Sequence, residues 1–539
     1  MKRPVGTAFL VAPILLYVGL FALLPAGILF AGSVAAAGGP SAVAAAVATP
    51  LNRQAIGNSL LQGGLSSLLA VGVGYPAGLF LGRYDWRGRE IVRSVLLVPF
   101  LLPSLVVVLA VRDLFGSGGL LSGPLPLLGA LGSGVPAIVA VNLVFNLPLV
   151  ILLTATGAAV APRALEETVV TLGGSPARAY RDAWGPSTWI GAAAGGLLTF
   201  LFSALSFAPP LLLCGPRCYT VEARVWSLDT TFLDPSGAGV LALVLLAAFA
   251  VPAIAYLELA RRLRSGGSLP SPGPPRRPRG PLAAALAAET ALVVAAVGLV
   301  LGAIVDRTVA PYGGAGVGAA WTALLSPATA RAVPIGIPGA LGNTLLFAAV
   351  AAGLAVLLTV PASLAVAGGR RGGSLLGFFL FAPLLVSPVV LAFALANFWR
   401  PLFGGEATVW VLVIVSQGML ALPFALQALG LPLSGLGSGP REAAETLGAP
   451  RFFAFLDADL PRLRDGLVTA GLFAFALGLG EFTATNFLVT PRFTTLPVAL
   501  YGLADSRHLL AADGAAGLLL LVSLAVFLAI SVGGRRVEL

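Results

Sequence analysis

The chain is poor in the side chains on which most enzymes and metalloproteins depend. Its 539 residues contain one histidine, His508, two cysteines and a single lysine, Lys2. The phosphate-binding loop of many ATPases requires a lysine in the pattern G-x-x-x-x-G-K-[ST], and no such lysine is present. We therefore expect no catalytic residue, no metal site and no cofactor bound by this chain.

Charged residues are also scarce, at 10% of the chain, whereas 58% of the residues are hydrophobic and the mean hydropathy is +0.97. So few charges could not cover a soluble protein of this length. A membrane-spanning helix needs about 20 apolar residues, and about twelve such runs predict an all-α polytopic membrane protein. These runs lie near 8–31, 56–82, 92–112, 135–160, 190–213, 238–260, 282–304, 341–367, 374–398, 408–430, 466–489 and 515–532.

Almost all of the basic residues are arginines in short loops. With the N-terminus inside, all but nine of the 32 basic residues fall on one side of the membrane, which the positive-inside rule makes cytoplasmic. We expect a multi-pass cell-membrane protein with both termini in the cytoplasm, and arginines that can attract anionic lipid headgroups. Their dispersal argues against nucleic acid as a partner. The first run is too long for a typical signal peptide, so we expect a retained span.

The sequence repeats itself at a nearly constant distance. GNSLL at 57–61 matches GNTLL at 342–346, which lies 285 residues further on, and Leu172-Gly173 matches Leu447-Gly448 at a distance of 275. Six spans per half is an even number, so both halves enter the membrane from the same side, as parallel repeats.

The repeat predicts three regions. The first six-helix half is 1–260 and the second is 282–539. Between them, 261–281 is rich in proline and arginine, which fits an extended cytoplasmic linker.

A charged segment interrupts the apolar runs of each half. In the second half it reads REAAETLGAPRFFAFLDADLP, residues 441–461. Pro440 and Glu442 suit the first turn of a helix, and Gly448 is a natural helix stop. The pattern predicts a compact helical knob, either an amphipathic helix in the membrane interface or a docking element for a soluble partner. Its presence in both halves favours docking.

This segment resembles the EAA loop of ABC importer permeases. The loop at 439–463 matches at Glu442, Ala443, Ala444, Leu447, Gly448 and Pro461, and the loop at 162–187 matches at Glu167, Leu172, Gly173 and Pro186. In the first loop Thr168 and Val169 replace the two alanines, so its docking is expected to be weaker or different in geometry.

The resemblance implies a type I ABC importer permease fold and a set of partners. In this family the loop enters a groove on a cytoplasmic ATPase. The resemblance therefore implies two partners. One is a cytoplasmic ATPase in two copies, which carry ATP and Mg, and the other is an external substrate-binding protein. A secondary transporter with parallel six-helix repeats is the alternative from another class, but it would have no use for paired EAA-like loops.

Two further segments bear on the substrate. GPRCYTVEARVW at 215–226 and PRFTTLPVALYGL at 491–503 resemble parts of thiamine permeases, and iron permeases share parts of both. We expect thiamine, with ferric iron as the alternative. Sulfate and polyamine importers, which share the EAA loop, also stay open.

The spans that follow the two loops are expected to line the pathway. The repeat aligns Ser206-Phe207 with Glu481-Phe482, and Thr483 and Asn486 follow in the same segment. A carboxylate within a span is costly, which makes Glu481 a candidate for attracting a cation, with a phenylalanine ring as a cation–π partner. The alternative is that Glu481 lies near the outer interface and pairs with Arg492 or with water.

Four smaller expectations complete the sequence analysis. Cys214 and Cys218 lie at the outer end of a span and could form a disulfide, although we expect them to be unpaired. Asn58 and Asn343 are expected to cap helices. His508 is expected in a solvated loop, and Arg112-Asp113 at the end of a span.

Overall fold

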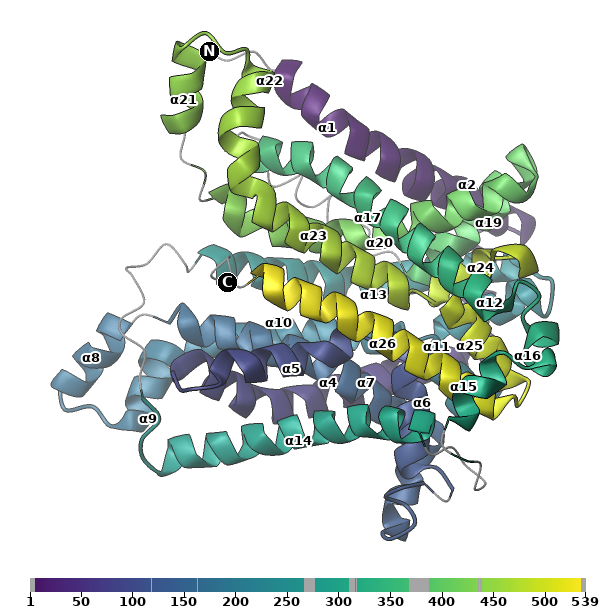
Figure 1. The fold of residues 1–539 in the computed structure, drawn as a ribbon, viewed down its shortest axis with the longest axis horizontal. Coiled ribbons are helices and arrows are strands. Elements are labelled where there is room, and N and C mark those ends of the chain that lie inside the picture. The colour runs from purple at the N-terminus through teal and green to yellow at the C-terminus, as the bar shows by residue number, and fades with distance from the viewer. Residues whose placement is uncertain are drawn as a thin grey trace. The chain divides into compact units, whose positions relative to one another are not determined.

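A computed structural model describes residues 5–117, 119–161, 163–265, 277–309, 316, 318–367, 387–434, 436 and 439–534, and these residues form helices joined by short connections (Figure 1). The all-α expectation is confirmed. The chain divides into two compact units, one of residues 37–319 and one of residues 1–36 together with 320–539. Each unit is described by itself.

The unit of residues 37–319 is built around three long, closely packed helices, α4, α7 and α10. Its elements are α3 (Ser41–Ala48), α4 (Pro50–Arg83), α5 (Arg89–Leu101), α6 (Ser104–Phe115), the 3-10 helix η2 (Pro126–Gly132), α7 (Gly134–Ala159), α8 (Arg163–Thr171), α9 (Pro176–Ala179), the π-helical turn η3 (Tyr180–Trp184), α10 (Gly185–Ala204), α11 (Ala208–Leu213), η4 (Gly215–Cys218), α12 (Val221–Thr230), α13 (Pro235–Ser265) and α14 (Pro281–Val309).

The other unit has the equivalent centre in α17, α20 and α23. Its elements are α1 (Val5–Val18), η1 (Gly19–Leu23), α2 (Leu24–Ala36), α15 (Ala319–Leu324), α16 (Pro327–Ala332), α17 (Gly336–Ala367), α19 (Pro388–Phe403), α20 (Glu406–Ser434), α21 (Gly439–Thr446), α22 (Arg451–Ala454), the π-helical turn η7 (Phe455–Asp459), α23 (Leu460–Gly480), α24 (Thr483–Leu488), η8 (Pro491–Phe493), α25 (Leu496–Asp505) and α26 (Leu509–Gly534).

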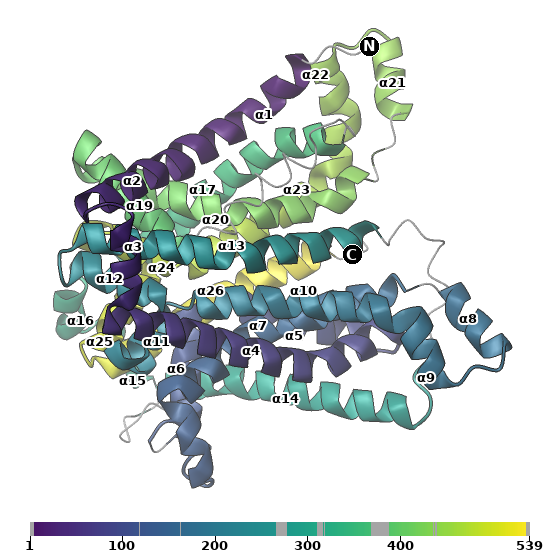
Figure 2. The ribbon, with the colours of Figure 1, turned by 180° about the vertical axis from the view of Figure 1, so that it is seen from behind.

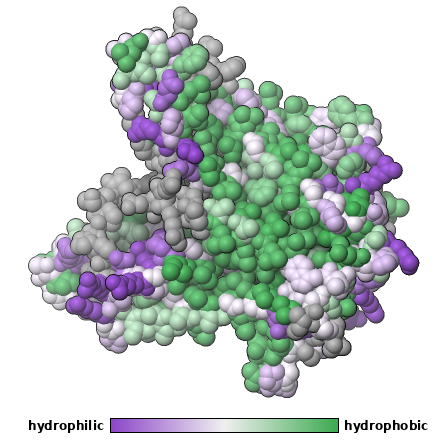
Figure 3. Space-filling model, in the orientation of Figure 1, coloured by the Kyte–Doolittle hydropathy of each residue, from purple (hydrophilic) through white to green (hydrophobic). Residues whose placement is uncertain are grey.

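Among the described residues, ten helices are long and apolar enough to cross a membrane, and the bent pair of α5 and α6 makes up to eleven. The predicted span at 374–398 lies partly outside the described residues. Figure 3 shows apolar surface along the long helices and hydrophilic residues toward their ends, as a bilayer requires. Two predicted spans, 190–213 and 466–489, are wrong in their boundaries, because each helix breaks partway, after Ala204 and after Gly480.

The compact units do not coincide with the predicted halves of the sequence. The first span of the chain, α1 with α2, packs against α17 and α19. The first span of the second half, α14, packs against α4 and α6 instead. Each repeat therefore gives its first span to the helices of the other. Most of the predicted linker at 261–281 lies outside the described residues.

Glycine allows α7 and α10 to approach closely (Figure 2). A Cβ atom on Gly191 would lie 2.2 Å from the carbonyl oxygen of Leu153, and one on Gly195 would lie 2.6 Å from the Cα of Val150. Lipid surrounds membrane helices with apolar solvent, so their association depends on close van der Waals packing, which small residues permit. The glycine content of this chain thus has a direct use at this helix pair.

Replacing Gly191 with alanine is expected to lower stability by about 1–3 kcal/mol, since the added methyl group overpacks a helix interface. Thermal unfolding of the purified protein in detergent would show the effect as a lower Tm. Gly72→Ala is the matched control, because a Cβ at Gly72 meets nothing within 4 Å. Equal Tm values for the two variants would contradict this account of the packing.

Candidate coupling loops and substrate pathway

Both charged segments fold into helical knobs of the same design. The first knob (residues 163–184) runs through α8, α9 and η3 into α10, and the second knob (residues 439–459) runs through α21, α22 and η7 into α23. In both views each knob projects beyond the end of the long helix that follows it (Figures 1 and 2). The predicted helical knob is thus confirmed in the second half, and the first half has the same order of elements.

Glycine ends the first helix of each knob. Gly173 has a φ of +76° and Gly448 a φ of +90°, a backbone conformation that glycine adopts at little cost. The following amides close the turn, with Gly174 N–H donating to Val169 O at 2.8 Å and Ala449 N–H to Ala444 O at 3.0 Å. This hydrogen bond is the signature of a Schellman helix end.

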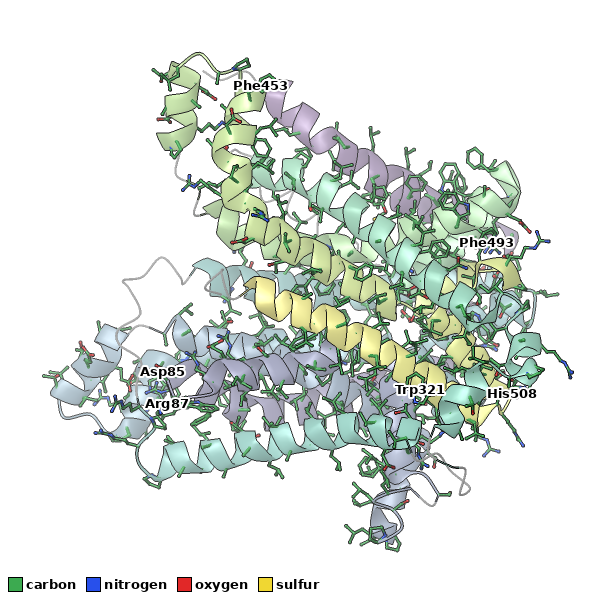
Figure 4. The ribbon with its side chains drawn as sticks, in the orientation of Figure 1. Asp85, Arg87, Trp321, Phe453, Phe493 and His508 are labelled. Carbon is green, nitrogen blue, oxygen red and sulfur yellow. A yellow bond between two sulfur atoms is a disulfide. The ribbon has the colours of Figure 1, made fainter. Side chains whose placement is uncertain are left out.

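The knobs present their sequence-predicted residues to the outside. Leu172 is 82% exposed and Leu447 is 89% exposed at the equivalent position. Glu167, Glu442 and Ala443 are exposed as well, and Ala444 is partly exposed. Phe453 adds a second exposed apolar side chain on α22 (Figure 4). An apolar tip flanked by carboxylates is suited to a groove in another protein.

The predicted pathway residues lie at the two helix breaks. Ser206-Phe207 separates α10 from α11, and Glu481-Phe482 separates α23 from α24. Both rings are buried, with Phe207 lying 6.0 Å from Trp226 and Phe482 lying 5.2 Å from Tyr501, centroid to centroid. The repeat therefore aligns not only two breaks but also the aromatic pairs that pack at them.

Glu481 caps the short helix that begins after the break. Its carboxylate accepts hydrogen bonds from Ala484 N–H at 2.7 Å, from Thr485 N–H at 2.8 Å and from the Thr485 hydroxyl. The alternative pairing with Arg492 is wrong, because Arg492 pairs with Glu406 at 3.0 Å.

Thr483 and Asn486 lie half-buried on the helix that Glu481 caps. The backbone N–H of Asn486 donates to the backbone carbonyl oxygen of Phe482 at 2.7 Å. A role of these residues in the pathway stays a prediction.

Asn58 and Asn343 do not cap helices, which corrects the expectation from the sequence. They lie within α4 and α17, where Asn58 Nδ2 donates to Tyr219 O at 3.1 Å and Asn343 Nδ2 donates to Thr494 O at 3.0 Å. A short amide side chain can hold distant backbone in this way when that backbone leaves a helix.

The next residue of each pair completes the contact. Ser59 Oγ accepts from Val221 N–H at 3.0 Å, and Thr344 Oγ1 accepts from Leu496 N–H at 2.7 Å. We call these two sets of bonds the polar clamps. Sequence reasoning missed them, although the match of GNSLL with GNTLL was their signal.

Of the smaller expectations, the unpaired cysteines are wrong, whereas those for Arg112-Asp113 and His508 are confirmed. Cys214 and Cys218 form a disulfide, because the end of α11 brings their Cα atoms to 5.6 Å. Arg112 and Asp113 lie in the last turn of α6, at a helix end as expected, and Asp113 is buried there and forms an ion pair with Arg307 of α14 at 3.3 Å. His508 is exposed in a loop, as expected (Figure 4).

The sequence of this chain is similar to those of known transport proteins. The family described as "Binding-protein-dependent transport system inner membrane component" matches residues 74–265. The molybdenum transport system permease protein of Escherichia coli K12 is 33% identical over 172 residues, which cover 28% of this chain and 75% of the relative. A probable molybdenum ABC transporter permease protein of Haloferax volcanii is 30% identical over 249 residues, covering 46% of this chain and 87% of the relative.

A third relative is the sulfate transport system permease protein of Escherichia coli K12, which is 35% identical over 91 residues, or 17% of this chain and 33% of the relative. The chain is therefore a member of the family of inner-membrane permease components of binding-protein-dependent transport systems. It is a multi-pass inner-membrane protein and a transport subunit.

The disulfide gives a direct chemical prediction. Without reductant, the denatured protein is expected to take up no maleimide, because both sulfur atoms are bonded to each other. After reduction it should gain two labels, measured by intact mass. Cys214→Ser is the control and should gain one label without reduction. Labelling of the unreduced parent protein at both cysteines would contradict the pairing.

Proposed function

We propose that this chain forms the translocation pathway of an ATP-driven importer and couples it to a separate cytoplasmic ATPase. The observation that carries the proposal is the pair of knobs, which have the same helix order, the same left-handed glycine and the same exposed leucine in both halves. A secondary transporter would not need two such knobs, and membership of the permease family removes that alternative.

Each knob would hold one copy of the ATPase, and the two ATPase copies would bind ATP and Mg. Their closure would move both knobs together, and an external binding protein would deliver the solute on the opposite side. This arrangement places both termini in the cytoplasm, on the side that carries most of the arginines.

The substrate that we favour is an oxyanion. The names of the relatives specify molybdenum, sulfate and, for putative permeases of Salmonella strains, 2-aminoethylphosphonate. Sulfate and phosphonates are tetrahedral oxyanions, and molybdenum dissolves in aerobic water as one. Thiamine and ferric iron, the substrates expected from the sequence, lose support because Glu481 already accepts three hydrogen bonds and caps α24.

Uptake by cells that lack this chain tests the substrate class. Labelled molybdate, sulfate, 2-aminoethylphosphonate, thiamine and ferric iron would each be supplied at low concentration, with the restored parent chain as the control. We expect loss of uptake of one oxyanion and unchanged uptake of thiamine and iron. Loss of thiamine uptake alone would overturn the oxyanion proposal and return attention to Glu481.

The coupling role predicts a difference between the two knob glycines. Gly448→Leu is expected to abolish uptake, because leucine is strained at a φ of +90° and displaces the exposed Leu447 beside it. Gly173→Leu should reduce uptake less, since the first loop departs from the EAA pattern. Uptake and the amount of permease in the membrane would be measured together.

Gly439→Leu serves as the control for a bulky residue on the second knob, because a Cβ there meets nothing within 4 Å and its φ is ordinary. Normal ATP-dependent uptake by Gly448→Leu would overturn the coupling role of the second knob.

A further inference from the structure

Each knob joins its long helix through a wide helical turn at the same place. The turns η3 (Tyr180–Trp184) and η7 (Phe455–Asp459) are five-residue π-helical turns whose bounds differ by 275 residues. In each, the amide that follows the turn bonds five residues back, Gly185 N–H to Tyr180 O and Leu460 N–H to Phe455 O. Turns of this kind are rare and occur often at functional sites.

Proline explains the position of the wide turns. Pro186 and Pro461 are the second residues after them and have no N–H to donate, which interrupts the α-helical hydrogen-bond ladder at that point. A helix with an interrupted ladder is a weak joint against bending. If the covalent backbone were the only connection, a movement of the knob would bend this turn and would move α10 or α23 only weakly.

A side-chain contact spans the joint in the first half. Glu166 of α8 pairs with Arg83 at the end of α4 at 2.8 Å, and both side chains are nearly buried. The Arg83 guanidinium carbon also lies 3.8 Å from the ring centroid of Trp184, the last residue of η3. Arg83 thus links the start of α8 to the end of η3, just before α10, through an ion pair on one side and a cation–π contact on the other.

The second half joins the same two positions with a different chemistry. Arg441 of α21 pairs with Asp459 at 3.6 Å, and the Asp459 side chain is only 5% exposed. Residues 441 and 459 are the repeat equivalents of 166 and 184, each 275 further on. In the first half Arg83 of α4 joins the two positions, whereas in the second half the residues at these positions pair directly. The connection is therefore retained with different side chains.

We infer that these contacts, Glu166–Arg83–Trp184 and Arg441–Asp459, are the braces that make each knob move as one body with its long helix when the ATPase closes. This inference rests on the proposed coupling function and adds positioning residues to it. The wide turn permits bending, and the brace, which connects the two sides of that turn, restricts it. Loss of a brace should leave ATP hydrolysis running while transport falls.

Proteoliposomes test this with the whole transporter, reconstituted with its ATPase and binding protein and supplied with the transported oxyanion. Solute uptake and ATP hydrolysis are measured on the same preparation for Arg441→Asp, Asp459→Arg and the double variant with both charges exchanged. Each single variant is expected to lose about tenfold in solute moved per ATP, within the usual range of coupling between sites. The exchanged pair should recover most of that loss.

Matched controls separate the brace from general damage. Glu445 also pairs with Arg441, at 3.4 Å, but lies on the same helix and does not span the joint, so Glu445→Gln should transport normally. Arg441→Gln removes the charge without repulsion and should uncouple as well, which keeps the test valid if a charge reversal fails to fold. In the first half Arg83→Gln should uncouple in the same way.

The outcomes are distinct. If the parent complex shows no ATP-dependent uptake of any solute, the proposed function fails. If the parent complex transports and Arg441→Gln moves as much solute per ATP as it does, the brace inference alone is overturned. The inference is overturned as well if the exchanged pair is folded, by size-exclusion profile, and no better coupled than the single variants.

Discussion

The structure depends on one constraint: backbone that leaves a helix inside a membrane must find hydrogen-bond partners within the protein, because lipid offers none. Both spans that follow the knobs break partway, and both breaks are satisfied by side chains. In the first half the Thr220 hydroxyl donates to Ser206 O at 2.7 Å, and in the second Glu481 caps α24. The polar clamps then fix the returning backbone against α4 and α17. The polar side chains that bond at these breaks thus have a structural role.

The two halves preserve contacts more faithfully than residue types. An asparagine followed by a hydroxyl residue forms both clamps, yet the break is satisfied by threonine in one half and glutamate in the other. The aromatic pairs and the braces across the wide turns show the same behaviour. Since different side chains can make an equivalent contact at the same position, its chemistry can be exchanged while its place in the fold is retained.

This distinction affects how the pathway is interpreted. Glu481 attracts notice in the sequence because an intramembrane carboxylate is costly. The structure shows that several donors offset this cost, so the residue has a sufficient structural role without a bound cation. A single acidic side chain with such a structural role is therefore no evidence for a transported cation.

The sequence by itself determined the membrane class, the repeat and the helical form of the knobs, because hydropathy, proline and glycine act locally along the chain. Only the tertiary structure decided the boundaries of the broken spans, the exchange of first spans between halves, the disulfide, and the partners of Asn58, Asn343 and Asp113. Most of these features depend on contacts between residues more than a hundred positions apart. The disulfide depends on how the chain turns at the end of α11. The repeat pointed to matching positions but could not show what each side chain would meet there, since neighbours across a packed interface leave no local pattern.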